Sequence, residues 1–323
     1  MQSARLRGVA AAVAVLIVAG LSGAGPQPKP VLAGAVSDHV VIVSIDGLRP
    51  DAIERFGATT LMRLAREGAS AQATTIYPSK TLPSHTSMLT GLTPEEHGVL
   101  WNEDRTDEHG EVSVVTVFEE AKRHGYTTAA FFSKSKFHHL QKEGTLDYTQ
   151  APDGMEKFMA TRTVEDVVRY LKFRRPNVLF VHIGEPDFAG HSIGWMSDAY
   201  GWAVRRADAA VARVLQSADE AYGEGEYTVI VTADHGGNGR NHGSDAATDM
   251  NIPWLVWGEG VAHAPVSTAV KTMDTAATAL WLLGLAAPPA WTGQAVGSAF
   301  TGEAQLLVEN ALSQRAMVGA TDD

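Results

Sequence analysis

The chain of 323 residues contains no cysteine. Disulfide bonds and zinc sites built from cysteine thiolates are therefore excluded. A transition-metal site in this chain has to be assembled from the side chains of histidine, aspartate, glutamate or hydroxyl residues.

Positive charge is also scarce. The sequence has 26 lysines and arginines against 37 aspartates and glutamates, which gives a formal net charge of -11. An acidic protein repels the phosphate backbone of nucleic acids, so we expect no nucleic-acid-binding surface. A small phosphate-ester substrate stays compatible with this charge, because bound divalent cations can reverse the local field.

Long hydrophobic runs are absent except near the N-terminus. There, Arg5 and Arg7 precede an apolar run over residues 8–20, a pattern typical of a secretory signal peptide. The run is shorter than the roughly 20 apolar residues of a membrane span. We therefore expect residues 1–35 to be a secretory signal segment and the protein to be exported, periplasmic or extracellular, with no stable membrane span after cleavage. The alternative is an uncleaved N-terminal membrane anchor.

The rest of the chain alternates between strand-like and helix-like segments. Short apolar runs occur at residues 39–45, 126–132, 177–183, 227–232 and 252–257. Helical patterns occur at residues 60–67, 113–124, 195–222 and 274–285. Continuous apolar runs suit strands that are buried on both faces. The alternation predicts an α/β fold with a mostly parallel central sheet flanked by helices on both faces. No linker interrupts residues 36–323, so we expect them to form a single domain.

Side chains suited to metal binding follow three of the predicted strands. In open parallel sheets, ligands bind outside the carboxyl ends of the strands. Taken singly, each of these residues is also compatible with a turn or a solvated loop. The candidates that share this position are Asp46, Asp187, His191, Asp234, His235 and His242.

Thr81 is a seventh candidate. A loop ends near this residue, Pro83 suits the first turn of a helix, and Gly91 suits its end. This would place the Thr81 hydroxyl at a helix N-terminus, where backbone N–H groups and the helix dipole favour an anion. The alternative is that Thr81 only caps the helix. Seven oxygen and imidazole ligands suit two divalent cations held about 4 Å apart.

Four stretches together resemble the alkaline phosphatase superfamily, and most closely its type I phosphodiesterase and nucleotide pyrophosphatase branch. They are IDGLRPD at 45–51, YPSKTLPSHTSMLTGLTPEEHGV at 77–99, EPDFAGH at 185–191 and ADHGGNGRNHG at 233–243. The resemblance implies an alkaline phosphatase-like catalytic domain over 36–323 that hydrolyses phosphate esters with two divalent metal ions. Zinc is the expected metal, although manganese or iron could occupy such sites.

The resemblance also implies a role for each matching residue. Thr81 would be the nucleophile and would form a phospho-threonine intermediate, and Asn102 would donate a hydrogen bond to a phosphoryl oxygen. One metal would be held by Asp46, Thr81, Asp234 and His235, and the other by Asp187, His191 and His242.

Lys134 and Lys136 leave open whether the substrate is a phosphate diester or a monoester. They resemble a pair of cations that some phosphate-monoester enzymes of the superfamily use to bind substrate, but they also suit a solvated basic loop. The leading hypothesis is a phosphodiesterase or nucleotide pyrophosphatase-like hydrolase. The alternatives are an exported alkaline phosphatase that acts on monoesters and a non-catalytic protein that binds metal or phosphate on the same scaffold.

Overall fold

The computed structural model describes residues 34–152 and 159–319. Residues 1–33, which hold the predicted signal segment except for its last two residues, lie outside this part. Within the described residues, no helix has the length and apolar character needed to cross a membrane.

A single sheet of seven strands forms the centre, in the order β2-β7-β6-β1-β5-β3-β4. The strands are β1 (Val40–Ile45), β2 (Ala69–Thr74), β3 (Thr128–Phe131), β4 (Tyr148–Gln150), β5 (Val178–Ile183), β6 (Thr228–Thr232) and β7 (Asn251–Gly258). Strands β6, β1, β5, β3 and β4 pair in parallel, and only β7 runs antiparallel to its neighbours β6 and β2. The predicted mostly parallel sheet is confirmed.

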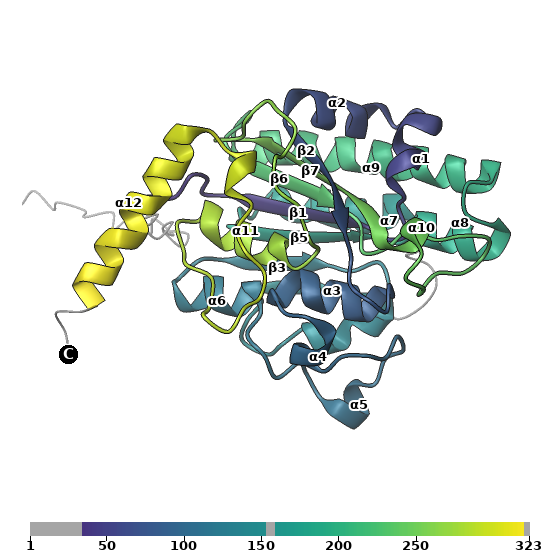
Figure 1. Cartoon of the computed structure of the whole chain (residues 1–323), viewed down its shortest axis with the longest axis horizontal. Coiled ribbons are helices and arrows are strands. Elements are labelled where there is room, and N and C mark those ends of the chain that lie inside the picture. The colour runs from purple at the N-terminus through teal and green to yellow at the C-terminus, as the bar shows by residue number, and fades with distance from the viewer. Residues whose placement is uncertain (1–33, 153–158, 320–323) are drawn as a thin grey trace, which may run out of the picture. The chain divides into compact units, whose positions relative to one another are not determined.

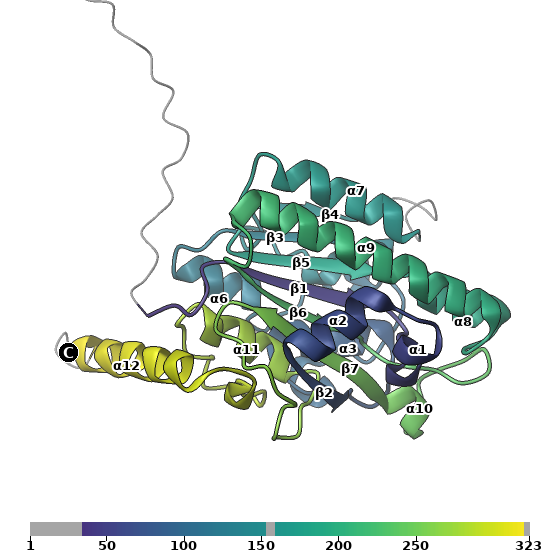
Figure 2. The same cartoon turned by 90° about the horizontal axis from the view of Figure 1, so that it is seen from above.

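Helices cover both faces of this sheet (Figures 1 and 2). Helices α2, α7 and α9 lie on one face, and α3, α6 and α11 lie on the other. The helices are α1 (Pro50–Arg55), α2 (Thr59–Glu67), α3 (Thr81–Thr90), α4 (Pro94–His97), α5 (Thr106–His109), α6 (Val117–Arg123), α7 (Ala160–Leu171), α8 (Glu185–Ile193), α9 (Asp198–Tyr222), α10 (Ala247–Met250), α11 (Asp274–Leu282) and α12 (Gly302–Gly319), with two 3-10 helices, η1 (Ser135–Leu140) and η3 (Gly297–Ala299). The predicted three-layer arrangement is therefore also confirmed.

The central strands change from apolar to polar toward their carboxyl ends. All six residues of β1 are buried, because helices cover both sides of the strand. Ser44 in β1 lies in register with His182 in β5 and with Thr232 in β6. A polar layer thus crosses three neighbouring strands just before they end, on the side where α1, α8 and α10 lie (Figures 1 and 2).

Two strands and several helix boundaries differ from the prediction, and α6, for example, begins at Val117 rather than at residue 113. Strands β2 and β4 lie at the two edges of the sheet and have few large apolar residues, so they lack the apolar signal of the central strands. The long helix predicted from residue 195 begins at Asp198, and Asp187 and His191 lie on the separate helix α8.

Candidate active site

The predicted metal-type residues meet at the carboxyl ends of three adjacent strands. Asp46 directly follows β1, α8 begins two residues after β5, and Asp234 lies two residues beyond β6. Because β1 lies between β5 and β6, the three connections lie side by side. The fold therefore brings together residues that are up to 196 positions apart, from Asp46 to His242.

The first predicted ligand set consists of Asp46, Thr81, Asp234 and His235. The other three side chains lie around the imidazole of His235. His235 Nε2 lies 3.2 Å from Asp234 Oδ2, 3.5 Å from Asp46 Oδ1 and 3.5 Å from Thr81 Oγ1. All four side chains are at most 1% exposed. Three oxygens of buried side chains thus converge with one imidazole nitrogen.

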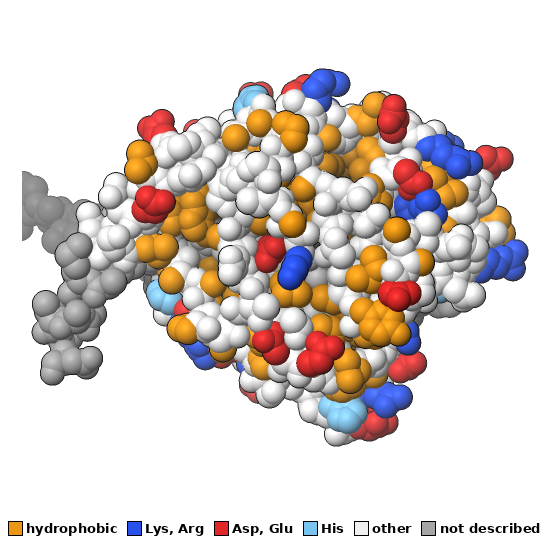
Figure 3. Space-filling model, viewed as in Figure 1, with side chains coloured by type: hydrophobic (Ala, Val, Ile, Leu, Met, Phe, Trp, Pro, Cys, Tyr) orange, Lys and Arg blue, Asp and Glu red, His pale blue; other side chains and the backbone are white. Residues whose placement is uncertain are grey.

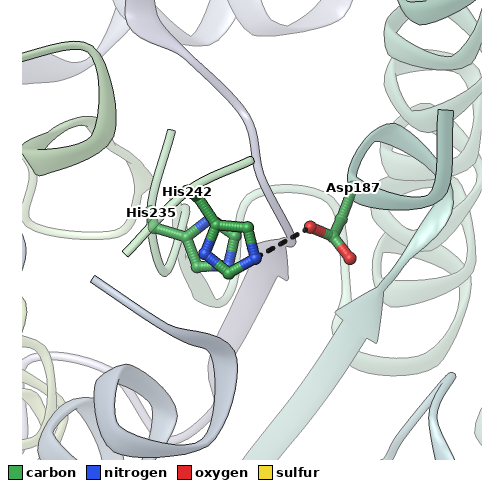
Figure 4. Close-up of side chains that lie close together, drawn as sticks. All are labelled: Asp187, His235 and His242. Atoms are coloured by element: carbon green, nitrogen blue, oxygen red, sulfur yellow. Dashed lines mark ion pairs between the residues drawn. The ribbon is translucent and has the colours of Figure 1, made fainter. Parts of the chain in front are cut away.

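The second ligand set, Asp187, His191 and His242, lies nearer the surface. Asp187 Oδ1 is 3.4 Å from His191 Nε2 and 3.7 Å from His242 Nε2, and the two imidazole nitrogens are 3.1 Å apart. The His191 side chain is 44% exposed. The rings of His242 and His235 stack with their centroids 3.7 Å apart, and Asp187 faces this stack (Figure 4). The two sets are therefore contiguous.

Backbone carbonyl groups fix the tautomers of the three histidines. The Nδ1–H groups of His191, His235 and His242 donate to the carbonyl oxygens of Arg240, Gly236 and Ser79 at 2.9, 2.8 and 2.8 Å. This leaves each Nε2 lone pair directed at the carboxylates. A metal-bound histidine usually donates its outer N–H to such an acceptor.

The hydrogen bonding of the three carboxylates indicates whether the site fits a metal ion. Asp46 Oδ1, Asp187 Oδ1 and Asp234 Oδ2 are buried and accept no hydrogen bond. The other oxygen of each carboxylate is bonded, as Asp234 Oδ1 is to the N–H groups of Gly47 and His235. Buried polar atoms without partners are costly and rare. The three unpaired oxygens point toward the Nε2 atoms, so the donor set fits divalent cations that accept both oxygen and nitrogen ligands.

Lys134 lies inside this site. Its ammonium group is 2.6 Å from both Asp46 Oδ2 and Asp187 Oδ2, and its side chain is 9% exposed. The solvated-loop interpretation is therefore wrong for Lys134. Gly184 lies beside it, and a β-carbon there would clash with Ser133 Oγ at 2.6 Å while only contacting Lys134 Cε at 3.4 Å.

Burial and neighbouring charges shift the pKa values of the ionisable side chains in the site. Burial raises the pKa of Asp234 well above its usual value, and the nearby charge of Asp46 raises it further. Burial acts in the same direction on Asp46, but the charge of Lys134 and the hydrogen bond from His182 hold that pKa well below its usual range. Burial lowers the pKa of His235 to about 3, which keeps the imidazole neutral and able to bind a metal.

Thr81 is the first residue of α3, as predicted, and Gly91 follows the helix in the left-handed conformation. Fewer backbone N–H groups are available beside it than we expected. The N–H of Leu82 donates to Asn102 Oδ1 at 3.0 Å, and Pro83 has no N–H. The anion-binding role of this helix end therefore shifts toward side chains.

Asn102 and Lys136 lie beside this helix end. Asn102 Oδ1 accepts from both the Leu82 N–H and Lys136 Nζ, each at 3.0 Å. These two bonds orient the amide so that its NH₂ group is the remaining donor. Burial, reinforced by the charge of Lys134, lowers the pKa of Lys136 to about 8.

Sequence reasoning missed two histidines that support the site. His182 Nε2–H donates to Asp46 Oδ2 at 2.9 Å and His182 Nδ1 accepts from the Ser133 hydroxyl at 2.8 Å. His85 Nδ1–H donates to the carbonyl oxygen of Thr81 at 2.7 Å. Both are fully buried. A histidine inside a buried apolar strand, as His182 is in β5, was the available signal.

Comparison with known proteins places the chain in a family. The model of the type I phosphodiesterase / nucleotide pyrophosphatase family matches residues 40–251. Human ectonucleotide pyrophosphatase/phosphodiesterase family member 1 is 25% identical over 222 residues, which cover 63% of this chain and 24% of that protein. GPI ethanolamine phosphate transferase 1 of Aspergillus oryzae is 25% identical over 280 residues, 76% of this chain and 27% of that protein. The chain thus spans about a quarter of the length of these relatives.

Solved structures agree on the fold. Murine ectonucleotide pyrophosphatase / phosphodiesterase 5, in an inactive form in complex with AMP, superposes with a TM-score of 0.69 at 17% identity, over 82% of this chain and 100% of that chain. A 2-O GAG sulfatase superposes with the same TM-score and identity, over 82% of this chain and 74% of that chain. The superfamily resemblance read from the four sequence stretches is confirmed. The chain belongs to the type I phosphodiesterase / nucleotide pyrophosphatase family.

Proposed function

We propose that this chain is a two-metal phosphoester hydrolase in which Thr81 is the nucleophile. The observation that carries the proposal is the position of Thr81 Oγ1, 3.5 Å from His235 Nε2 and beside three carboxylates that each have an unpaired buried oxygen. Asp46, Thr81, Asp234 and His235 would hold one cation, and Asp187, His191 and His242 the other. When bound, two divalent cations, most suitably zinc, supply charge that stabilises an alkoxide and a negatively charged phosphoryl group.

The chain's own residues then have the following tasks. Thr81 Oγ attacks phosphorus as the bond to the leaving oxygen breaks, and the hydroxyl proton passes to solvent. Water then breaks the bond between Thr81 Oγ and phosphorus, which releases the product and restores the hydroxyl. The NH₂ group of Asn102 donates to a phosphoryl oxygen, and the hydrogen bond from His85 to the Thr81 carbonyl holds the nucleophile in place.

The family favours phosphodiesters and nucleotide pyrophosphates as substrates, so we propose this specificity first. Lys134 and Lys136 support a second candidate, hydrolysis of phosphate monoesters. A monoester carries more negative charge than a diester, and Lys136 lies beside Asn102, the proposed phosphoryl contact. A half-buried ammonium group next to this contact suits that additional charge.

We also propose that the protein is exported, with residues 1–35 as a secretory signal segment and an uncleaved anchor as the alternative. The proposed partner is a small phosphate-ester substrate rather than nucleic acid. On the face shown in Figure 3, lysine and arginine side chains lie singly among acidic ones, which supports this choice.

The test is hydrolysis of generic aryl phosphate diesters and monoesters by purified protein, with and without a chelator. We expect hydrolysis that the chelator abolishes and added zinc restores. A preference for the diester supports the first substrate class. A preference for the monoester that Lys136→Met removes selectively supports the second. Zinc binding without hydrolysis of either substrate would instead favour the non-catalytic binding protein.

A further inference from the structure

Trp195 connects the segments that carry both ligand sets. It lies in the turn between α8 and α9 and is 7% exposed. Its indole contacts three glycines, and each of these belongs to a different part of the site: Gly47 follows Asp46, Gly190 precedes His191, and Gly237 lies two residues after His235. A single side chain therefore packs against the turn after β1, helix α8 and the loop after β6.

These contacts leave no room for a larger residue at the glycines. A β-carbon on Gly190 would lie 2.6 Å from the Trp195 ring, and one on Gly237 would lie 2.3 Å from it. Neither glycine has a positive φ angle, so backbone conformation does not require glycine at either position. The space taken by the indole explains why glycine occupies both positions.

Hydrogen bonds fix the indole in this position. Trp195 Nε1–H donates to the carbonyl oxygen of Gly47 at 2.9 Å, and this oxygen also accepts from the Tyr200 hydroxyl at 2.8 Å. The backbone N–H of Trp195 donates to the carbonyl oxygen of Gly239 at 2.8 Å, in the loop that leads to His242. The residue thus links the end of β1 to the loop after β6.

The ring of Trp195 also meets both histidines of the second ligand set edge to face. Its centroid lies 5.1 Å from that of His191 and 5.8 Å from that of His242. The His191 side chain is 44% exposed, and the indole packs beside its hydrogen bond to the Arg240 carbonyl oxygen. The indole supplies a rigid surface against which both imidazoles are oriented.

We propose that Trp195 is a positioning residue for the second metal, which keeps His191 and His242 directed at Asp187. The proposal rests on the proposed function, because it assumes that the second ligand set binds a metal. Residues behind metal ligands typically change metal affinity by about 10–100-fold when they are replaced. Loss of the indole should therefore weaken the second site far more than the first.

The test is zinc titration of the metal-free full chain against a competing chelator, which yields separate affinities for the two sites. His191→Asn identifies which of the two belongs to the second set. We expect Trp195→Leu to weaken that site by about 10–100-fold and Trp195→Phe to weaken it less, because phenylalanine keeps part of the packing. The first site should keep its affinity in both variants.

Trp254 provides a matched control. It is fully buried in β7, in register with Thr232, and its Nε1–H donates to Thr275 Oγ1 at 3.2 Å, so Trp254→Phe loses the same kind of packing and hydrogen bond. We expect this variant to be destabilised while both zinc affinities persist. Equal zinc affinities in Trp195→Leu and wild type, or an equal loss in Trp254→Phe and Trp195→Phe, would overturn the positioning role.

A double-mutant cycle adds a readout that general destabilisation would not produce. Gly190→Ala should weaken the second site in the wild-type background, because its methyl group displaces the indole. In the Trp195→Leu background the same substitution should cost much less. Additive effects would contradict the proposal. A wild-type chain that binds fewer than two zinc ions would instead contradict the proposed function.

Discussion

Asp208 and Asp234 are both buried aspartates, but their surroundings differ. Asp208 in α9 uses both carboxylate oxygens: Oδ1 accepts from the N–H of Leu61 at 2.8 Å, and Oδ2 accepts from the N–H of Thr60 at 3.1 Å. Asp234 has bonds to Oδ1 only, and its Oδ2 faces His235 Nε2 without a donor. The fully bonded carboxylate holds the start of α2 in place. The half-bonded one marks a place where a ligand completes the site.

This contrast extends to the other site carboxylates. Asp46 and Asp187 share the pattern of Asp234, with one oxygen bonded to Lys134 and the other unpaired. Burying a charge is favourable only when it is paired. We infer that cations would complete the site by binding the carboxylate oxygens that its own hydrogen bonds leave unpaired.

The largest effect should come from Thr81→Ala. Removal of the only nucleophile that we propose should reduce turnover by about three orders of magnitude or more, while the six remaining ligands retain metal. Turnover and zinc content of the same sample check this. Thr81→Ser, which keeps a hydroxyl, is the matched control and should retain part of the activity. Persistent turnover in Thr81→Ala would show that the nucleophile lies elsewhere.

Asp234→Asn should separate metal binding from stability. The amide oxygen can still accept from the N–H groups of Gly47 and His235, but the charge that attracts a cation is lost. Replacing a residue that only supports a metal ligand lowers metal affinity by up to about 100-fold. Because Asp234 is proposed to be a ligand itself, we expect zinc affinity at the first site to fall by more than that. The metal-free variant should be at least as stable as wild type, because burial and Asp46 disfavour the charge of Asp234. A chelator titration and a thermal melt without metal measure the two effects.

Asp208→Asn should show the opposite pattern. One of the two N–H groups at the start of α2 would face the NH₂ group of the amide and lose its acceptor. We expect the free energy of unfolding to fall by about 1–3 kcal/mol. Urea denaturation of the metal-free protein would measure this loss, and zinc affinity should not change. A loss of zinc affinity in Asp208→Asn would remove the distinction between scaffold and site.

A smaller effect concerns acid stability in the scaffold. His97 Nδ1 accepts from the N–H of Val99 at 3.1 Å, so protonation of this nitrogen would break the bond. Burial lowers the pKa of His97 to about 4. The unfolded chain takes up this proton near pH 6.5, so the stabilising contribution is complete above that pH and is lost as the pH falls toward 4. The slope is at most about 1.4 kcal/mol per pH unit.

Replacement of His97 tests this slope. Denaturation of wild type and His97→Gln between pH 4 and 7 should show a shallower pH dependence in the variant. The exposed residue His263 offers a control, and His263→Gln should leave the slope unchanged. Equal slopes in wild type and His97→Gln would mean that other groups determine the acid sensitivity.

The sequence predicted the central strands and five of the helices, α2, α3, α6, α9 and α11, because their signals are local. Strand β1 is a continuous apolar run, and Gly68 and Gly91 follow the helices that they were predicted to end. Strand β2 reads ASAQAT and has no such run, since an edge strand buries less of its surface. This strand forms because it pairs with β7, which lies far away in the sequence.

In the candidate site, too, local signals could be recognised and contacts between distant segments could not. The ligand candidates could be recognised because each follows a buried strand, and parallel strands bring their ends together. The burial of Lys134 could not be predicted, since a lysine between two serines is typical of a loop and its partners Asp46 and Asp187 lie in distant segments. The role of Trp195 was hidden for the same reason. Its contacts join three segments that are far apart in sequence.

The most direct test of the central claim is the stereochemical course of hydrolysis at phosphorus. Each in-line displacement inverts the configuration, so attack by Thr81 followed by attack by water gives overall retention. The experiment is hydrolysis of a chiral phosphorothioate diester in water enriched in oxygen-18, with configurational analysis of the product. Our account predicts retention. Inversion would mean that water attacks the substrate in a single step, and Thr81 would then not be the nucleophile.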